Sequence, residues 1–211
     1  MELPLFPYEL VGFPGVPVPL RFFEPRYKQM CEDVVGATDR FGIVLAAPGS
    51  RFEAEVPVEV GTVARIVDHV RLPDGQWLVH AVGESRFRLT RLGPRRPYLT
   101  AEVNEVEEKA GDDLRAFALR DALLGKLRRL FALRTELGGP SLPVDVELDD
   151  EPGPASYELA ALMGLDLATQ QRLLEIEADD DRLAAEVLLM DEALAGVEHR
   201  LTRGGGFGGL K

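Results

Sequence analysis

The chain has 211 residues, and its 36 Asp and Glu outnumber its 24 Lys and Arg, so the formal net charge is −12. This length allows one large domain or two small ones. The acidic balance disfavours a nucleic-acid-binding protein, which needs a basic surface. Residues 1–100 contain 12 acids and 12 bases, whereas residues 101–211 contain the other 24 acids and 12 bases. We therefore expect two modules with different surfaces.

The cysteine content and the apolar segments of the sequence also indicate the cellular compartment. Cys31 is the only cysteine, so the chain has no internal disulfide and no cysteine-rich metal site. Residues 1–20 are interrupted by five prolines and lack the basic and apolar regions of a signal peptide. No run of about 18 apolar residues predicts a membrane span. We expect a cytoplasmic protein without a cofactor.

Short apolar runs predict strands in the first half of the chain. Residues 3–7 and 16–20 are rich in proline, which has no donor for a ladder hydrogen bond, so we expect them at sheet edges or beside bulges. Residues 25–35 show helical spacing and begin with Pro25, which suits a first helical position. Residues 41–46 form a run typical of a buried strand.

An Asp-Gly pair predicts a tight hairpin between the β-rich runs at residues 60–72 and 76–82. If Asp74 and Gly75 form a two-residue loop, His69 faces His80 with Cβ atoms about 5 Å apart. Two imidazoles do not complete a zinc site, which usually takes at least three protein ligands, so we predict no metal site. Further strands are expected at residues 86–92 and 98–106, giving six or seven in all.

The second half of the chain has helical periodicity. Helices are predicted at residues 112–137, 155–163, 167–177 and 180–201, and residues 204–211 form a glycine-rich tail that we expect to be flexible. Strands followed by helices indicate an α+β fold. The expected modules are a β module at 1–107 and a helical bundle at 108–203.

Motifs of several enzyme classes are missing from the sequence. The only Gly-Lys pair, Gly125-Lys126, is followed by Leu127 rather than Ser or Thr, so there is no phosphate-binding loop. No serine lies in G-x-S-x-G, and no histidine lies in H-E-x-x-H. The residues therefore predict no catalytic site.

A group of arginines interleaved with Phe87 and Tyr98 is compatible with binding of single-stranded nucleic acid. Its members are Arg86, Arg88, Arg91, Arg95 and Arg96. Strand alternation would place Phe87 inward and both Arg86 and Arg88 outward. A solvated strand face explains the pattern equally well, and we favour it.

Several motifs occur in an order that carries a family resemblance. They are Leu3-Pro4-Leu5-Phe6-Pro7, Phe13-Pro14-Gly15, Pro19–Tyr27, Phe41–Leu45, Val60–Ala64, Asp74-Gly75, Gly83–Leu89, Pro97–Val103, Leu159–Leu162 and Gln170–Ile176. Together they resemble the N-terminal, substrate-binding domain family of Lon proteases over nearly the whole chain. The resemblance implies a PUA-like β-barrel followed by a helical bundle. It also implies a stand-alone form that lacks the ATPase and Ser-Lys protease domains, and therefore no enzyme.

The resemblance implies a non-enzymatic module that binds exposed hydrophobic segments of other proteins. Its expected partners are unfolded or degron-bearing proteins, with a separate protease as a further candidate. Candidate binding residues are Phe13, Phe22, Phe23, Tyr27 and Trp77, although aromatic residues more often belong to a core. The alternative is a PUA-like RNA-binding module that uses the Arg86–Arg96 region. The clients and the oligomeric state are left open.

Overall fold

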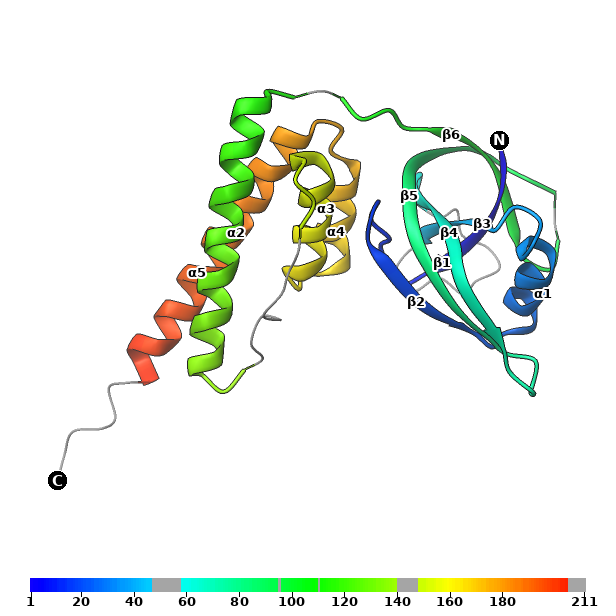
Figure 1. Ribbon diagram of the computed structural model, residues 1–211, viewed down its shortest axis with the longest axis horizontal. Coiled ribbons are helices and arrows are strands. Elements are labelled where there is room, and N and C mark those ends of the chain that lie inside the picture. Colours follow the sequence, from blue (N-terminus) through cyan, green and yellow to red (C-terminus); the bar gives the residue numbers. More distant parts are fainter. Residues whose placement is uncertain (47–57, 95, 110, 140–147, 205–211) are drawn as a thin grey trace. The chain divides into compact units, whose positions relative to one another are not determined.

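The computed structural model describes residues 1–46, 58–94, 96–109, 111–139 and 148–204 (Figure 1). The chain divides into two compact units. One comprises Met1–Glu107 with Leu165–Glu177, and the other comprises Glu108–Gly164 with Ala178–Lys211. The sequence pattern assigns residues 167–177 to the C-terminal helices, but in the structure this segment groups with the strands. A mixed sheet combined with helices confirms the predicted α+β class.

Six strands form the sheet of the first unit. They are β1 (Glu2–Tyr8), β2 (Pro17–Phe22), β3 (Arg40–Leu45), β4 (Val60–Arg71), β5 (Trp77–Leu92) and β6 (Leu99–Glu105). Their order is β2-β5-β4-β3-β1-β6, and β5 also pairs with β6, so five strands close into a barrel. Among the strands that the structure describes, β2 pairs with β5 alone, so one of its edges is free of strand pairing.

β5 is one long strand where the sequence pattern predicts two with a break between them. At the middle of β5, Gly83 lies against the segment that leads into β2. Gly15 N–H donates to the Gly83 carbonyl at 2.9 Å, and a Cβ at Gly83 would lie 2.1 Å from the Phe13 carbonyl oxygen. The glycine is therefore needed for a close backbone approach, rather than for a turn.

The expectation that residues 3–7 lie at a sheet edge or beside a bulge is wrong, because β1 pairs without a register shift with β3 on one side and with β6 on the other. Pro4 and Pro7 nevertheless do not cost the sheet a hydrogen bond between strands. The nitrogen of Pro4 faces the β3 side, where pairing starts only at Leu5. The nitrogen of Pro7 faces the other side, where pairing with β6 has already ended.

The prediction of a two-residue hairpin loop is also wrong, because the loop is one residue longer. Leu72 N–H donates to the Gln76 carbonyl at 2.8 Å, so the loop has three residues and ends at Gly75, whose φ is 79°. Such a loop needs a left-handed residue at its last position, which suits glycine. The register consequently pairs His69 with Val79 rather than with His80.

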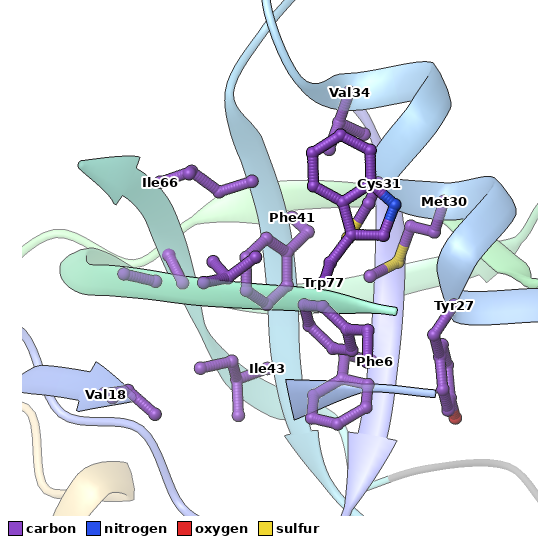
Figure 2. Close-up of a cluster of buried hydrophobic side chains, with 14 of the residues drawn as sticks. Phe6, Val18, Tyr27, Met30, Cys31, Val34, Phe41, Ile43, Ile66 and Trp77 are labelled. Carbon is purple, nitrogen blue, oxygen red and sulfur yellow. The ribbon is translucent and has the colours of Figure 1, made fainter. Parts of the chain in front are cut away.

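One cluster of apolar side chains fills the end of the barrel beneath α1 (Pro25–Val34), as Figure 2 shows. The helix begins with proline as predicted, and its buried residues are Tyr27, Met30, Cys31 and Val34. These residues recur at the three- and four-residue spacing of one helix face, so burial of that face holds the helix on the barrel.

α4 (Leu167–Glu175) is attached to the barrel by polar contacts from two strands. Arg86, which is only 1% exposed, donates to the carbonyls of Leu174 at 2.9 Å and Ile176 at 2.7 Å, with a longer contact of 3.4 Å to the Glu177 carbonyl. Gln171 donates to the Val60 carbonyl at 3.0 Å. A cation at a helix C-terminus meets carbonyls that have no helical partner, so Arg86 caps α4 and fixes it to β5.

The second unit consists of α2 (Asp113–Glu136), α3 (Pro152–Leu162) and α5 (Asp179–Gly204). α2 and α5 lie side by side (Figure 1). Ion pairs join Arg115 to Asp180, Lys126 to Asp191 and Arg129 to Glu198, so residue numbers increase together and the two helices run parallel. Within the described ranges, no helix is both long enough and apolar enough to cross a membrane.

The core of the helical unit contains two ionisable residues one turn apart on α5. Arg182 donates to Ser156 Oγ at 2.5 Å and stacks on the Tyr157 ring at 3.8 Å. Glu186 is fully buried, and neither carboxylate oxygen has a hydrogen-bond partner among the residues that the structure describes. Burial raises the pKa of Glu186 well above its ordinary value, even though Arg182 favours the charged form.

Candidate functional site

The barrel unit has a surface pocket of about 250 Å³ between β1 and β2, beside the start of α1. It forms because the pairing of β1 with β6 ends at Leu5, while β2 pairs only with β5 among the described strands. The barrel wall is therefore open at this point. The residues that line the pocket are Phe6, Tyr8, Pro19, Leu20, Arg21, Phe23, Glu24 and Tyr27.

The floor of the pocket belongs to the barrel core. The Phe6 ring meets the rings of Tyr27 and Phe22 edge-on, with centroid distances of 4.7 and 4.9 Å. Burial raises the pKa of the Tyr27 hydroxyl to about 12, so it stays protonated, and it donates to the Pro7 carbonyl at 3.3 Å. This bond satisfies an acceptor on the unpaired side of β1. The floor is thus a fixed aromatic surface rather than a group of mobile side chains.

The rim of the pocket is aromatic and accessible. Phe23 is 57% exposed, and Tyr8 is 41% exposed while its ring stacks on Phe6 at 5.1 Å. Glu24 is paired with Arg26 at 2.7 Å, and the Arg26 guanidinium lies 4.6 Å from the centre of the Tyr27 ring. Exposed aromatic side chains around a hollow with an apolar floor are typical of a binding site.

The structure separates the five candidate aromatic residues. Phe13, Phe22 and Trp77 are buried in the barrel, in agreement with the core interpretation. Tyr27 is also buried but lines the pocket, and Phe23 lines it from the rim. The sequence interpretation missed Tyr8, Leu20 and Arg21. One signal was present, because Phe6 and Tyr8 are two residues apart and so lie on the same face of a strand.

Of the four candidate arginines that the structure describes, one is buried and three are exposed beside carboxylates. Arg86 points out of the barrel as strand alternation predicts, but α4 covers it, so the solvated-face interpretation is wrong for this residue. Arg91 pairs with Glu102 at 2.5 Å and Arg96 with Glu2 at 3.2 Å. Arg88 lies 3.7 Å from Glu59 and 4.0 Å from Glu177. Arg95 lies outside the described residues.

The histidine pair of the sequence interpretation is not formed. The His69 ring instead lies 5.6 Å from the Trp77 ring, and His80 is opposite Asp68. Across the described part of the chain, no group of three or more His, Cys, Asp or Glu side chains is placed to hold a metal ion.

Comparison with known families gives a match over most of the chain. The family model for the ATP-dependent protease La (LON) substrate-binding domain matches residues 2–192. The chain belongs to this family. The resemblance inferred from the ordered motifs is thereby confirmed.

Relatives of known sequence are Lon proteases of bacteria. The Lon protease of Azospirillum brasilense is 25% identical over 186 residues, which are 87% of this chain and 23% of that protein. The Lon protease of Trichlorobacter lovleyi is 31% identical over 86% of this chain and 22% of its own length. The chain therefore spans less than a quarter of the length of these relatives.

Solved structures show the same fold. The crystal structure of a Lon N-terminal domain protein from Xanthomonas campestris superposes with a TM-score of 0.62 at 26% identity, covering 87% of this chain and 95% of the other. The N-terminal domain of the Mycobacterium avium complex Lon protease superposes with a TM-score of 0.63 at 18% identity, covering 90% of this chain and 98% of the other. The second likeness shows the fold alone.

Proposed function

We propose that this chain is a non-enzymatic recognition module that binds exposed hydrophobic segments of client proteins for a Lon-type protease. The observation that carries this proposal is the accessible aromatic pocket between β1 and β2, in a chain that belongs to the substrate-binding domain family. The clients are unfolded or degron-bearing polypeptides, and the protease is the partner that receives them.

The chemistry of the pocket supports a side chain as its ligand. Its volume of about 250 Å³ is below the roughly 300–1,000 Å³ of sites that hold drug-sized molecules. The fixed floor around Phe6 loses little conformational entropy when a ligand binds, and Phe23 and Tyr8 supply apolar area at the rim. One large apolar side chain, presented by an unfolded segment, fits these properties.

Phe23→Ala should weaken binding of an unfolded client at least tenfold without lowering the stability of the fold. The ring provides accessible apolar area for the ligand, and its loss removes roughly 1.4 kcal/mol or more of binding free energy. Because Phe23 is largely exposed, little packing is lost. Fluorescence anisotropy with a labelled, reduced and carboxymethylated model protein measures the affinity.

Leu114→Ala is the matched control for this variant. Leu114 is 86% exposed on α2, so its truncation removes exposed apolar area in the other unit and should leave the affinity unchanged. Trp77 is the only tryptophan of the chain and is buried in the barrel, so its fluorescence reports whether the barrel of each variant is folded. Equal affinities of wild type and Phe23→Ala, with the barrel intact, would contradict the proposed site.

The RNA-binding alternative receives less support from the geometry. Arg86 is covered, and Arg88, Arg91 and Arg96 each lie beside a carboxylate, which reduces the positive field available to phosphates. We therefore propose protein binding alone.

A further inference from the structure

Among the residues that the structure describes, one cation at the pocket has no carboxylate partner. Arg21 lines the pocket and is exposed, and its Nε donates to the neutral Gln76 Oε1 at 2.8 Å. Among the described residues, no carboxylate lies within 4.0 Å of its guanidinium. The other charged residue of the lining, Glu24, is already paired with Arg26 at 2.7 Å. Within the lining, Arg21 is therefore the charged side chain that has no ionic partner among the described residues.

The free edge of β2 adds a second donor at the same residue. Gly83 N–H donates to the Val16 carbonyl at 3.2 Å, so alternate residues from Val16 onward bond to β5, and residues 17, 19 and 21 face away from it. Pro17 and Pro19 have no N–H group. Arg21 N–H is thus the one backbone donor on this outward edge of β2.

The two prolines disfavour the binding of a peptide as a further strand along β2. A peptide that extended the sheet along β2 would find no donors at Pro17 and Pro19, so its pairing would stop after about one residue pair. A carboxylate needs donors only, and the guanidinium and the backbone N–H of Arg21 supply them beside the apolar pocket.

We propose that the pocket binds the carboxyl-terminal residue of a polypeptide, with an apolar side chain against Phe6 and Phe23 and the terminal carboxylate at Arg21. This inference rests on the proposed function, because it names the part of the client that enters the same pocket. It distinguishes a chain end from an internal hydrophobic segment, which lacks the carboxylate. Charge complementarity between Arg21 and the carboxylate, together with the two prolines of the edge, determines this choice.

Three labelled peptides of one sequence test the proposal with the intact chain. The first ends in phenylalanine with a free carboxylate, the second ends in the same residue as an amide, and the third has Gly-Ser added after the phenylalanine. Fluorescence anisotropy should give at least tenfold tighter binding for the free carboxylate than for either of the other two. Equal affinities for the three peptides would overturn the carboxylate assignment but leave the proposed function standing. If none of the three binds, both fail.

Arg21→Gln identifies the residue responsible. This variant should weaken binding of the free-carboxylate peptide to the level of the amide and leave the amide peptide within twofold of its wild-type affinity. Arg91→Gln is the matched control, because it removes an exposed arginine elsewhere on the barrel, and it should keep the tenfold preference. A preference that persists in Arg21→Gln would also overturn the assignment.

Discussion

Replacement of Arg86 with leucine should release α4 from the barrel and lower the free energy of unfolding by about 3 kcal/mol. The guanidinium makes two short hydrogen bonds and one longer contact to carbonyls at the end of α4, and hydrogen bonds to charged groups contribute roughly 1.5–3 kcal/mol each. Leucine removes these hydrogen bonds at the contact between α4 and β5.

Two measurements separate the local effect from the global one. Urea unfolding followed by Trp77 fluorescence gives the stability of the barrel, and hydrogen exchange of the amides of α4 reports its attachment. Arg91→Gln changes only an exposed ion pair, so its stability should lie within about 0.5 kcal/mol of wild type. Unchanged exchange protection of α4 in Arg86→Leu would contradict the role of Arg86 as its anchor.

Glu186→Gln should stabilise the helical unit by about 1.4 kcal/mol or more at pH 8, which is the free energy equivalent of one unit of pKa shift, because the amide removes the carboxyl group that must bind a proton on folding. Burial raises the pKa of Glu186 in the folded chain, so the native state holds a proton that the unfolded state releases above its ordinary pKa of about 4.5. The contribution of Glu186 to the stability of the folded state is therefore greatest at low pH. It falls as the pH rises above about 4.5, until the folded carboxyl itself ionises.

The difference in the free energy of unfolding between Glu186→Gln and wild type isolates the contribution of Glu186. Urea unfolding followed by circular dichroism at 222 nm, at pH 5 and pH 8, should show a larger gain for Glu186→Gln at pH 8. Glu192→Gln, at an exposed position of the same helix, should show no such gain at either pH. A gain independent of pH would mean that Glu186 ionises normally in the folded chain.

The local elements of this fold can be predicted from the sequence because their signals are local. Pro25 and the spacing of Tyr27, Met30 and Val34 predict α1, and Asp112 caps α2 by accepting from Arg115 N–H. The register of the β4–β5 hairpin could not be predicted, because a two-residue and a three-residue loop are both compatible with Pro73-Asp74-Gly75. A shift of one residue then moves His69 away from His80.

The contacts that define the site connect residues far apart in the chain. Arg86 is 88 residues from Leu174, and its position on an outward strand face gives no sign that a helix covers it. The pocket depends on where the pairing of β1 with β6 ends, which no periodicity of residues 3–7 reveals. Phe23 and Tyr27 were candidates from their residue type and from the family resemblance. Arg21 was not, since a single arginine in a strand has no special pattern.

The most direct test of the account locates a bound client on the surface. A peptide carrying one photoreactive phenylalanine analogue, irradiated with the intact chain and analysed by mass spectrometry, reports which residues touch its apolar side chain. We predict crosslinks to the pocket-lining residues Tyr8, Leu20 and Phe23, and competition by the same peptide without the photoreactive group. Crosslinks that map elsewhere on the barrel or on α2 and α5, with none in the pocket, would contradict the account.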